Sequence, residues 1–304
     1  LDANFLNSRL RFNFDFYKKK TKDMLLALEI PKFIGYDNPF VNTGNMETTG
    51  YDIELGWHDQ VGDFSYSVSA NLSDFVSKMG DLGGTEFLGD GLFLTQEDVD
   101  NSPKLNNNTM VGDIKYKDIS GPDGVPDGKI SSEYDRVFLG GSLPRYSFGV
   151  NFSAGYKGFD FSMMLQGVGK QNVRITRYMV EPLFYNWGGF PDLLDGNVWS
   201  VNNTDAENVN VKYPRLTRNN IESNMAMSDY WLFNGRYLRM KNLTLGYTLP
   251  SVLTKKISMN SVRFYVSAND LFSLSKFPKG WDPEVDEKGY PINMSVLLGV
   301  SVNF

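Results

Sequence analysis

The sequence predicts an all-β protein whose antiparallel strands form part of a transmembrane β-barrel. Three observations support this fold class: strands that alternate apolar with small polar residues, aromatic residues concentrated on the apolar positions, and connections that alternate between short and long. Aromatic residues make up 14% of the chain, and 29 of its 304 residues are glycine. This composition is typical of strands, turns and rings placed at a membrane interface.

The clearest alternation runs over residues 146–156, where the even positions are apolar and the odd positions small or polar. Residues 293–304 repeat the pattern, with Leu297 as the only exception. Successive strand side chains point to opposite faces, so each segment has one apolar face. A change of phase between Met240 and Leu243 predicts a β-bulge. The other expected strands are residues 10–16, 24–30, 51–57, 64–72, 159–165, 236–249 and 262–268.

The connections between these strands alternate in length. Lys157 and Gly158 form a two-residue turn of the type I′ kind, and residues 18–23 and 59–63 are also expected to be short turns. Residues 250–260 make a moderate connection. The long connections are residues 31–49, 74–144, 167–235 and 273–292. Short turns on one rim and long loops on the other are expected of an outer-membrane barrel. The alternative is a soluble antiparallel sandwich with one solvated face.

The number of strands indicates a section of a larger barrel. Nine strands in 304 residues is about 34 residues per strand. A transporter barrel of about 22 strands would need on the order of 740 residues, besides a plug in its lumen. Residues 1–304 are therefore predicted to be the C-terminal part of such a barrel, with the plug domain and the N-terminal strands absent.

Composition argues against several functions. A formal net charge of −6 gives no support for nucleic-acid binding. Without cysteine there is no thiol catalysis, thiolate metal site or disulfide. His58 is the only histidine, so a catalytic triad would depend on it and a zinc site would lack further imidazole ligands. We expect His58 to lie at a strand end beside a short turn, and we assign no catalytic residue.

An acidic loop is the sharpest local feature. Its closely spaced carboxylates and glycine turns are suited to a hard cation such as Ca²⁺, which would stiffen an external loop. Residues 127–130 have the Asp-Gly-x-Ile form of an EF-hand loop, but Tyr134 stands where the bidentate glutamate belongs. The alternative is a solvated cluster of acidic turns. The candidate ligands are Asp118, Asp123, Asp127, Glu133 and Asp135.

Aromatic side chains gather in the long loops, above all over residues 178–199. Rings on outer loops can stack on sugar faces or pack against a partner, and they can equally pack the loops on each other. The candidate substrate-binding residues are Tyr185, Trp187 and Trp231.

The polar strand faces carry a second set of candidates. They are expected to face the lumen, where they would line a transport path or contact a plug. These lumen-facing candidates are Arg11, Asn13, Asp15, Asp52 and Glu54.

Several segments, in this order, resemble the C-terminal signatures of the SusC/RagA family of TonB-dependent transporters. Residues 16–25 resemble its YxKxTxDLL hairpin, and residues 49–55 its NKGxExxL segment, with Thr49 in place of lysine. Residues 112–118 resemble GDxKYxD, and residues 236–247 are close to YLRLKNLTLGY. Residues 269–272 and 282–285 resemble QNLF and DPEV. The resemblance covers essentially the whole chain, and the order and spacing of the motifs make it specific.

The resemblance implies import of oligosaccharides or peptides across the outer membrane of a Gram-negative, Bacteroidetes-like bacterium. It also implies a SusD-like surface lipoprotein as a lid, TonB acting through an N-terminal region, and contact with outer-membrane lipid. Family members carry a shorter DxNGDGxIxxxD loop, which favours Ca²⁺ by resemblance. Three alternatives remain: a siderophore or metal-complex receptor without a lid, a non-transporting barrel that serves as adhesin or anchor, and a soluble Ca²⁺-binding β-protein.

Overall fold

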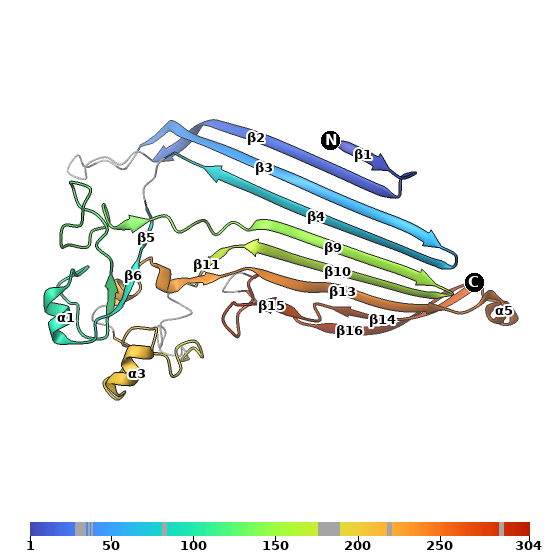
Figure 1. Cartoon of the computed structure of the whole chain (residues 1–304). Helices are drawn as coiled ribbons and strands as arrows, with labels where there is room; N and C mark the ends of the chain where they lie inside the picture. The colour runs from blue at the N-terminus through green and yellow to red at the C-terminus, as the bar shows by residue number, and fades with distance from the viewer. Residues whose placement is uncertain are drawn as a thin grey trace.

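One large antiparallel sheet dominates the computed structural model, which describes residues 1–27, 35, 37, 39–80, 84–175, 189–217, 221–285 and 289–304. Its long strands run side by side from the end with short turns to the end with long loops (Figure 1). The short strand β15 (Ser273–Ser275) also pairs with β13. Across the sheet the strands are β1 (Asp2–Phe5), β2 (Leu10–Ala27), β3 (Phe40–Val61), β4 (Phe64–Lys78), β9 (Arg145–Tyr156), β10 (Phe159–Lys170), β13 (Tyr237–Thr248), β14 (Ser261–Asn269) and β16 (Ser295–Asn303).

The register separates the side chains into two faces, as the period-two pattern predicts. Residues directly opposite each other on neighbouring strands share a face. Phe14 pairs with Ile53, and Ile53 pairs with Leu72, on what we call the apolar face. Asn13 pairs with Glu54, and Glu54 with Asn71, on the polar face. Apolar residues elsewhere on the apolar face are exposed, with Phe16 at 65%, Leu55 at 46% and Phe264 at 48%.

The short connections lie at one end of the sheet and have the expected turn chemistry. Lys157 and Gly158 have φ angles of 45° and 88°, which are the two left-handed residues of a type I′ turn. Gly62, with φ 62°, turns β3 into β4. The moderate connection between β13 and β14 contains α5 (Ser251–Thr254) and the 3₁₀ helix η3 (Lys255–Ile257). His58 lies near the end of β3, as expected, and its backbone N–H donates to the Arg9 carbonyl at 3.0 Å.

The predicted phase change in β13 is a β-bulge. Leu165 of β10 is opposite Met240, and Met164 is opposite Asn242, so Lys241 is the extra residue. The bulge restores Met240 to the face shared by Leu243, which explains why the sequence pattern slips by one position at this point.

Two sequence predictions about the N-terminal strands are wrong. Residues 18–23 are not a turn: β2 continues through them, and the register only shifts between Thr21 and Met24, where Asp23 has φ 56°. The predicted strands 10–16 and 24–30 are thus one strand as far as Ala27, and residues 28–30 lie outside the described part. The predicted connection 31–49 is strand from Phe40 onward. The sequence pattern also missed β1, so in the described residues the path across the sheet still has nine strands, and β15 is a tenth that pairs with β13.

At the opposite end from the short turns, the long connections fold on each other (Figure 1). In their described parts these connections contain three small two-stranded sheets besides short helices. Their elements are β5 (Glu86–Phe87), β6 (Gly89–Leu92), α1 (Gln96–Asn101), β7 (Ile114–Tyr116), β8 (Arg136–Val137), β11 (Asn172–Arg174), α3 (Asp205–Asn210), α4 (Ile221–Asn224), the 3₁₀ helix η2 (Asp229–Trp231) and β12 (Leu232–Asn234). We call residues 84–144, 171–175, 189–217, 221–236 and 276–285 the outer-loop assembly.

Within the described residues, no helix has both the length and the apolar character needed to cross a membrane.

Candidate functional site in the outer loops

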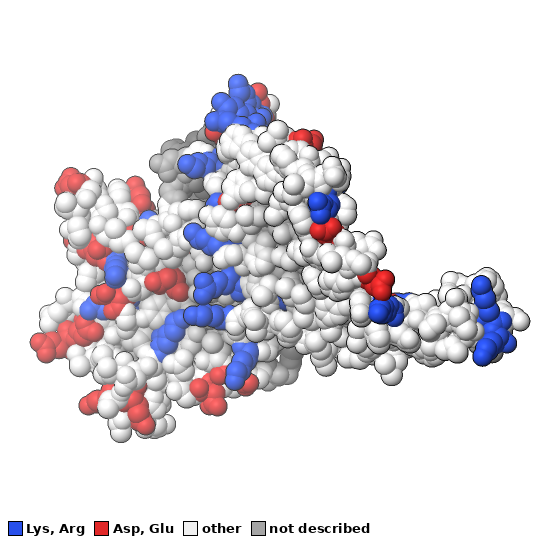
Figure 2. Space-filling view, turned by 45° about the vertical axis from the view of Figure 1, so that its right-hand side comes forward, with Lys and Arg blue, Asp and Glu red and all other residues white. Residues whose placement is uncertain are grey.

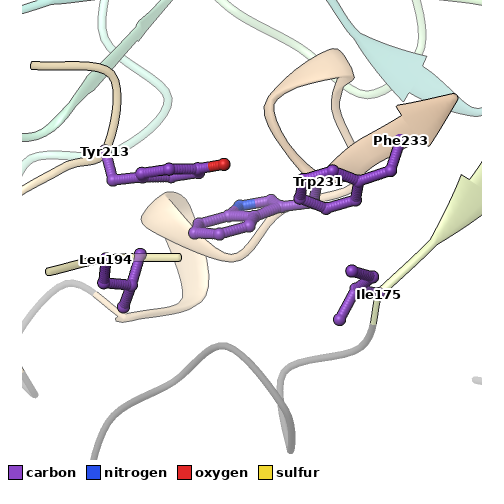
Figure 3. Close-up of a cluster of buried hydrophobic side chains, with 5 residues drawn as sticks. All are labelled: Ile175, Leu194, Tyr213, Trp231 and Phe233. Atoms are coloured by element: carbon purple, nitrogen blue, oxygen red, sulfur yellow. The ribbon is translucent and has the colours of Figure 1, made fainter. Parts of the chain in front are cut away.

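The outer-loop assembly has hydrophobic cores of its own, separate from the large sheet. One core, which we call the Trp231 core, consists of Ile175, Leu194, Tyr213, Trp231 and Phe233 (Figure 3). Tyr213 stacks on Trp231 with ring centroids 5.3 Å apart and ring planes inclined by 23°. Burial in this core raises the pKa of Tyr213 to about 12.

A second core lies beside the first. It contains Phe87, Leu92, Ile114, Tyr116 and Ile130, and Tyr230 packs against both cores. Because its residues come from positions 87 to 130, this core ties the first long loop together. Because of these two cores, the long loops pack on each other and fold as one unit.

A polar node joins three segments of the assembly. The Asp113 carboxylate is fully buried and accepts hydrogen bonds from Arg215 Nε at 2.6 Å and Asn224 Nδ2 at 3.0 Å. The backbone N–H of Met110 also donates to this carboxylate, at 2.9 Å. The side-chain oxygen of Asn224 accepts from the Ile114 N–H at 3.0 Å, and its backbone carbonyl accepts from Trp231 Nε1 at 2.8 Å. Residues about 110 positions apart are therefore held in one geometry.

A cavity of about 900 Å³ opens beside this node. Its walls include Phe190, Val201 and Leu216 with the ring of Trp199, and Arg215 reaches it from the polar node. Trp199 lies so close to Gly112 that a Cβ on that glycine would come within 2.4 Å of the ring. The GDxKYxD motif thus contributes the glycine against which the cavity's tryptophan rests.

The polar side chains around the cavity mainly support the loop. Glu207 caps α3, accepting from the Thr204 N–H at 2.7 Å and the Thr204 hydroxyl at 2.9 Å. Asn203 donates to the Val198 carbonyl at 3.1 Å. The rest of the lining is mixed, because Ser200, Asn210 and Arg215 add polar groups to the aromatic and aliphatic residues. The cavity is therefore suited to a ligand or partner group that has both an apolar and a polar part.

Of the three predicted aromatic ligand-binding residues, the structure describes only Trp231. Trp231 is 2% exposed at the centre of its core and donates its indole N–H to a carbonyl, so it offers no ring face to a ligand. Its prediction as a substrate-binding residue is wrong, because the ring packs the loops on each other. Tyr185 and Trp187 lie outside the described residues. Trp199 belongs to the same aromatic-rich stretch and, unlike Trp231, lines a cavity.

The five predicted Ca²⁺ ligands do not converge. Among the described residues there is no group of three or more histidine or acidic side chains arranged to hold a metal ion. Asp123, Asp127 and Glu133 are exposed, and Asp135 is buried at the neck of the loop. Asp118 Oδ2 accepts from the Gly128 N–H at 2.6 Å, and its Oδ1 is buried without a hydrogen-bond partner. The Ca²⁺ site stays a prediction.

Asp135 acts as a brace for the acidic loop. Its Oδ1 accepts from the N–H groups of Ile119 and Ser120, at 2.7 and 3.2 Å, and its Oδ2 accepts from the Ser131 N–H at 2.7 Å. A carboxylate that accepts from three backbone donors holds residues 119–131 together as a loop.

We expect Asp135→Ala to loosen this loop, because it removes a buried acceptor and leaves three amides unpaired. The opening free energy of residues 119–131 should fall by about 3 kcal/mol. Hydrogen–deuterium exchange of the full-length protein measures this, and exposed Asp123→Ala is the matched control. Both variants are measured with Ca²⁺ and with EGTA. Protection of this loop by Ca²⁺ in the wild type, lost in Asp118→Ala, would support the predicted metal site instead of a purely structural brace.

The five candidate lumen residues do share the polar face. Arg11, Asn13 and Asp15 alternate along β2, and Asp52 and Glu54 lie opposite Asp15 and Asn13 on β3. Asn13 Nδ2 donates to Glu54 Oε2 at 2.9 Å. This face lies opposite the exposed apolar residues.

An ion-pair cluster on the polar face joins the loop of residues 276–285 to β13 of the large sheet. This cluster was not predicted from the sequence. Arg239 is buried, and its guanidinium lies 2.6 Å from Asp282, 3.5 Å from Glu284 and 3.8 Å from Asp270. Lys241 bonds Asp270 at 3.1 Å and Glu284 at 2.9 Å. The motifs around residues 239 and 282 were visible in the sequence, but their pairing was not.

The fold and the loops together define a class of structure: a section of an antiparallel β-barrel whose long loops fold together at one end. The structure superposes over 100% of its length on the RagAB peptide importer in its open-open state, with a TM-score of 0.72 and 22% identity, covering 34% of that chain. A second RagAB structure, the closed-closed state, gives a TM-score of 0.70. These likenesses confirm the predicted fold class.

Curated relatives confirm the resemblance to SusC/RagA-type TonB-dependent receptors. TonB-dependent receptor P3 of Formosa agariphila is 27% identical over 94% of this chain. TonB-dependent receptor SusC of Bacteroides thetaiotaomicron is 28% identical over 100% of it. The chain spans 30% and 31% of the length of these two proteins, so about a third of each. No protein-family model matches the chain.

Proposed function

We propose that this chain is the C-terminal part of the barrel of an outer-membrane, TonB-dependent importer. The observation that carries the proposal is the sheet itself: a broad antiparallel wall, apolar and exposed on one face and polar on the other, with a folded loop assembly at one end only. An exposed apolar face of this extent is suited to lipid, and a polar face to a lumen. The similarity to SusC and to the RagAB importer supports the same function.

The edges of the sheet support a closed barrel. In the described part of the chain, β1 and β16 are the two edges of the sheet and pair with no strand beyond β2 and β14. Leu298 and Val300 on β16 are 85% and 57% exposed. A long apolar edge strand is prone to aggregate unless further strands cover it. Upstream strands of a longer polypeptide would close both edges, with the plug inside, as predicted from the strand number.

The proposed cargo is an oligosaccharide or a peptide, taken in with a SusD-like lipoprotein acting as a lid. The outer-loop assembly is the proposed meeting place. Its cavity beside Trp199 presents aromatic and aliphatic walls that can pack against a sugar face or an apolar side chain. The cargo is carried without chemical change, and TonB acts on a region upstream of these strands.

Uptake by a deletion strain tests this proposal. We expect loss of the full-length gene to abolish growth on one class of cargo, oligosaccharide or oligopeptide, with normal growth on the monomers. We also expect a surface lipoprotein to co-purify with the detergent-extracted protein. Unchanged growth on both cargo classes, with loss of ferric-siderophore uptake, would favour the receptor without a lid. A full-length protein that is monomeric in water without detergent would rule out a membrane barrel.

A further inference from the structure

The apolar face is bounded by aromatic side chains at both ends. At the end with short turns, one row of directly paired residues crosses five strands: Phe64, Tyr156, Phe159, Tyr247 and Phe264. Toward the outer loops, Phe16 of β2 pairs with Tyr51 of β3. The upper level consists of this one pair of rings, and on β4 the residue opposite Tyr51 is Asp74, which is paired with Arg145. Aromatic rings at two levels are typical of the two membrane–water interfaces of a barrel.

The spacing of these rows matches a membrane. Along β3, about ten residues separate Val61, next to the lower row, from Tyr51 in the upper one. At about 3.3 Å per residue and a strand tilt of about 40°, this corresponds to a height of roughly 25 Å, the usual height of a barrel's apolar band.

Basic residues follow directly above the upper aromatic row, on the same face. Lys18 and Lys20 continue the alternation of Phe14 and Phe16 along β2. Lys20 pairs with Glu47 of β3, and Glu47 pairs with Lys78 of β4. We call Lys18, Lys20 and Lys78 the basic rim. Figure 2 shows Lys and Arg side chains gathered at the top of the view, over the ends of β2 and β3 that lie toward the outer loops.

The rim has an excess of positive charge that solvent can reach. The side chains of Lys18 and Lys20 are 50% and 61% exposed, and Lys78 is exposed as well. Glu47 is the single carboxylate among them, 2.5 Å from Lys18 Nζ and 3.5 Å from Lys20 Nζ. It holds two of the three ammonium groups close together while neutralising only one charge.

We propose that the basic rim binds the phosphate groups of an anionic lipid in the outer leaflet, whose acyl chains lie on the apolar face below. This rests on the proposed placement in the outer membrane. Two levels of one face match the two parts of such a lipid. The backbone of Lys18 and Lys20 lies about 5 to 10 Å beyond Phe16 along the barrel height, at the level of the headgroup, and the exposed aromatic and aliphatic residues below lie at the level of the chains.

The position of the rim excludes the cargo as its ligand. Cargo passes along the polar face, whereas the rim lies on the apolar face with Phe16 and Tyr51. Lysine is a compact, flexible charge that binds phosphate without a fixed fork geometry, which suits a mobile headgroup. A loop of the lid lipoprotein would have to descend to the membrane surface to reach it.

Lipid titration of the full-length protein in dodecyl maltoside micelles tests this. The probes are bisphosphorylated lipid A and zwitterionic phosphatidylcholine, and native mass spectrometry counts the lipids retained. The test variant is Lys18→Gln/Lys20→Gln/Lys78→Gln. The matched control is Lys255→Gln/Lys256→Gln, two exposed lysines of η3 at the opposite end of the strands. Glu47→Gln is a second test variant, because it removes only the negative charge.

We expect the triple variant to bind lipid A on the order of 30-fold more weakly and Glu47→Gln several-fold more tightly, with phosphatidylcholine unaffected in both. The Lys255/Lys256 control should bind as the wild type does. Lipid A binding within two-fold of the wild type in the triple variant would overturn the proposal, and so would an equal loss of phosphatidylcholine. Cargo uptake is measured in parallel, so that failure of the two proposals can be told apart. A wild-type protein that binds lipid A through the basic rim but imports no cargo would contradict the proposed function and leave the lipid-binding inference standing.

Discussion

Asp113→Ala should unfold the outer-loop assembly while leaving the strands intact. The change removes the Asp113 carboxylate from the polar node, and Arg215, which is 17% exposed, loses the anion that its Nε bonds. Breaking one partner out of a buried ion pair typically costs about 3–5 kcal/mol, because the remaining charge stays buried without compensation. Asn224 loses a bond as well, and with it the support for the Ile114 amide and for Trp231.

Hydrogen–deuterium exchange by segment is the measurement for this variant. Residues 84–116 and 190–231 should exchange on the order of 100-fold faster or more, and β9 and β10 should not change. Asp113→Asn keeps the shape of the side chain, so its exchange rates should lie between those of the wild type and those of Asp113→Ala. Lys115→Gln, on the neighbouring strand β7, is the matched control, since its ion pair with Asp98 is 22% and 27% exposed and is worth about 1 kcal/mol or less. Equal effects of Asp113→Ala and Lys115→Gln would show that the node is not what holds the loops.

Arg239→Gln should release the last outer loop from the barrel wall. In the native cluster two cations face three carboxylates, so removal of Arg239 leaves Lys241 alone against Asp270, Asp282 and Glu284. Asp282 and Glu284 are only 9% and 11% exposed, and we expect a local loss of about 3–5 kcal/mol. The freed segment carries Phe277 and Trp281, which pack against the Trp231 core, so the Trp231 core should loosen too.

The pH dependence of this cluster has a definite sign. Burial opposes ionisation of Asp282, but its bonds to Arg239 and to backbone amides outweigh burial and hold its pKa below the usual value. A carboxyl group with a lowered pKa contributes stability above its unfolded-state pKa and loses it as pH falls through the folded one. In the wild type, segment 276–285 should therefore stay protected at neutral pH and loosen only in acid. In Arg239→Gln, acid should instead reduce the repulsion among the carboxylates.

Hydrogen–deuterium exchange of residues 276–285 measures both the loss of stability in Arg239→Gln and its pH dependence. Arg263→Gln is the control, since its partner Asp160 is 42% exposed and the pair lies on the same face of the sheet, toward the short turns. It should cost about 1 kcal/mol or less and leave the loop protected. Protection of residues 276–285 in Arg239→Gln equal to that in the wild type would mean that packing of Phe277 and Trp281 alone holds the segment.

Much of the wall could be predicted from the sequence because strand faces depend on a local rule. Side chains alternate by two along any strand, so the apolar and polar faces of β3, β9 and β16 follow from neighbouring residues. The same holds for the turn at Lys157 and Gly158, whose backbone needs two left-handed residues, and for the bulge at Lys241, which appears as a slip in the pattern.

The tertiary structure decided what depends on distant partners. Residues 18–23 resembled a turn because charged residues interrupt the apolar pattern, yet pairing with β3 carries β2 straight through them. Trp231 resembled an exposed ligand-binding aromatic because it lies in a loop, yet side chains from several loops, from Ile175 to Trp281, bury it.

The sequence by itself therefore determined the class of fold, the two faces and the asymmetry of the rims. Only the tertiary structure could bring together Asp113 with Arg215, Arg239 with Asp282, and Lys20 with Lys78. The physical reason is range: alternation and turn chemistry act over two to four residues, whereas burial, ion pairing and strand register are set by chain segments that meet only when the sheet has formed.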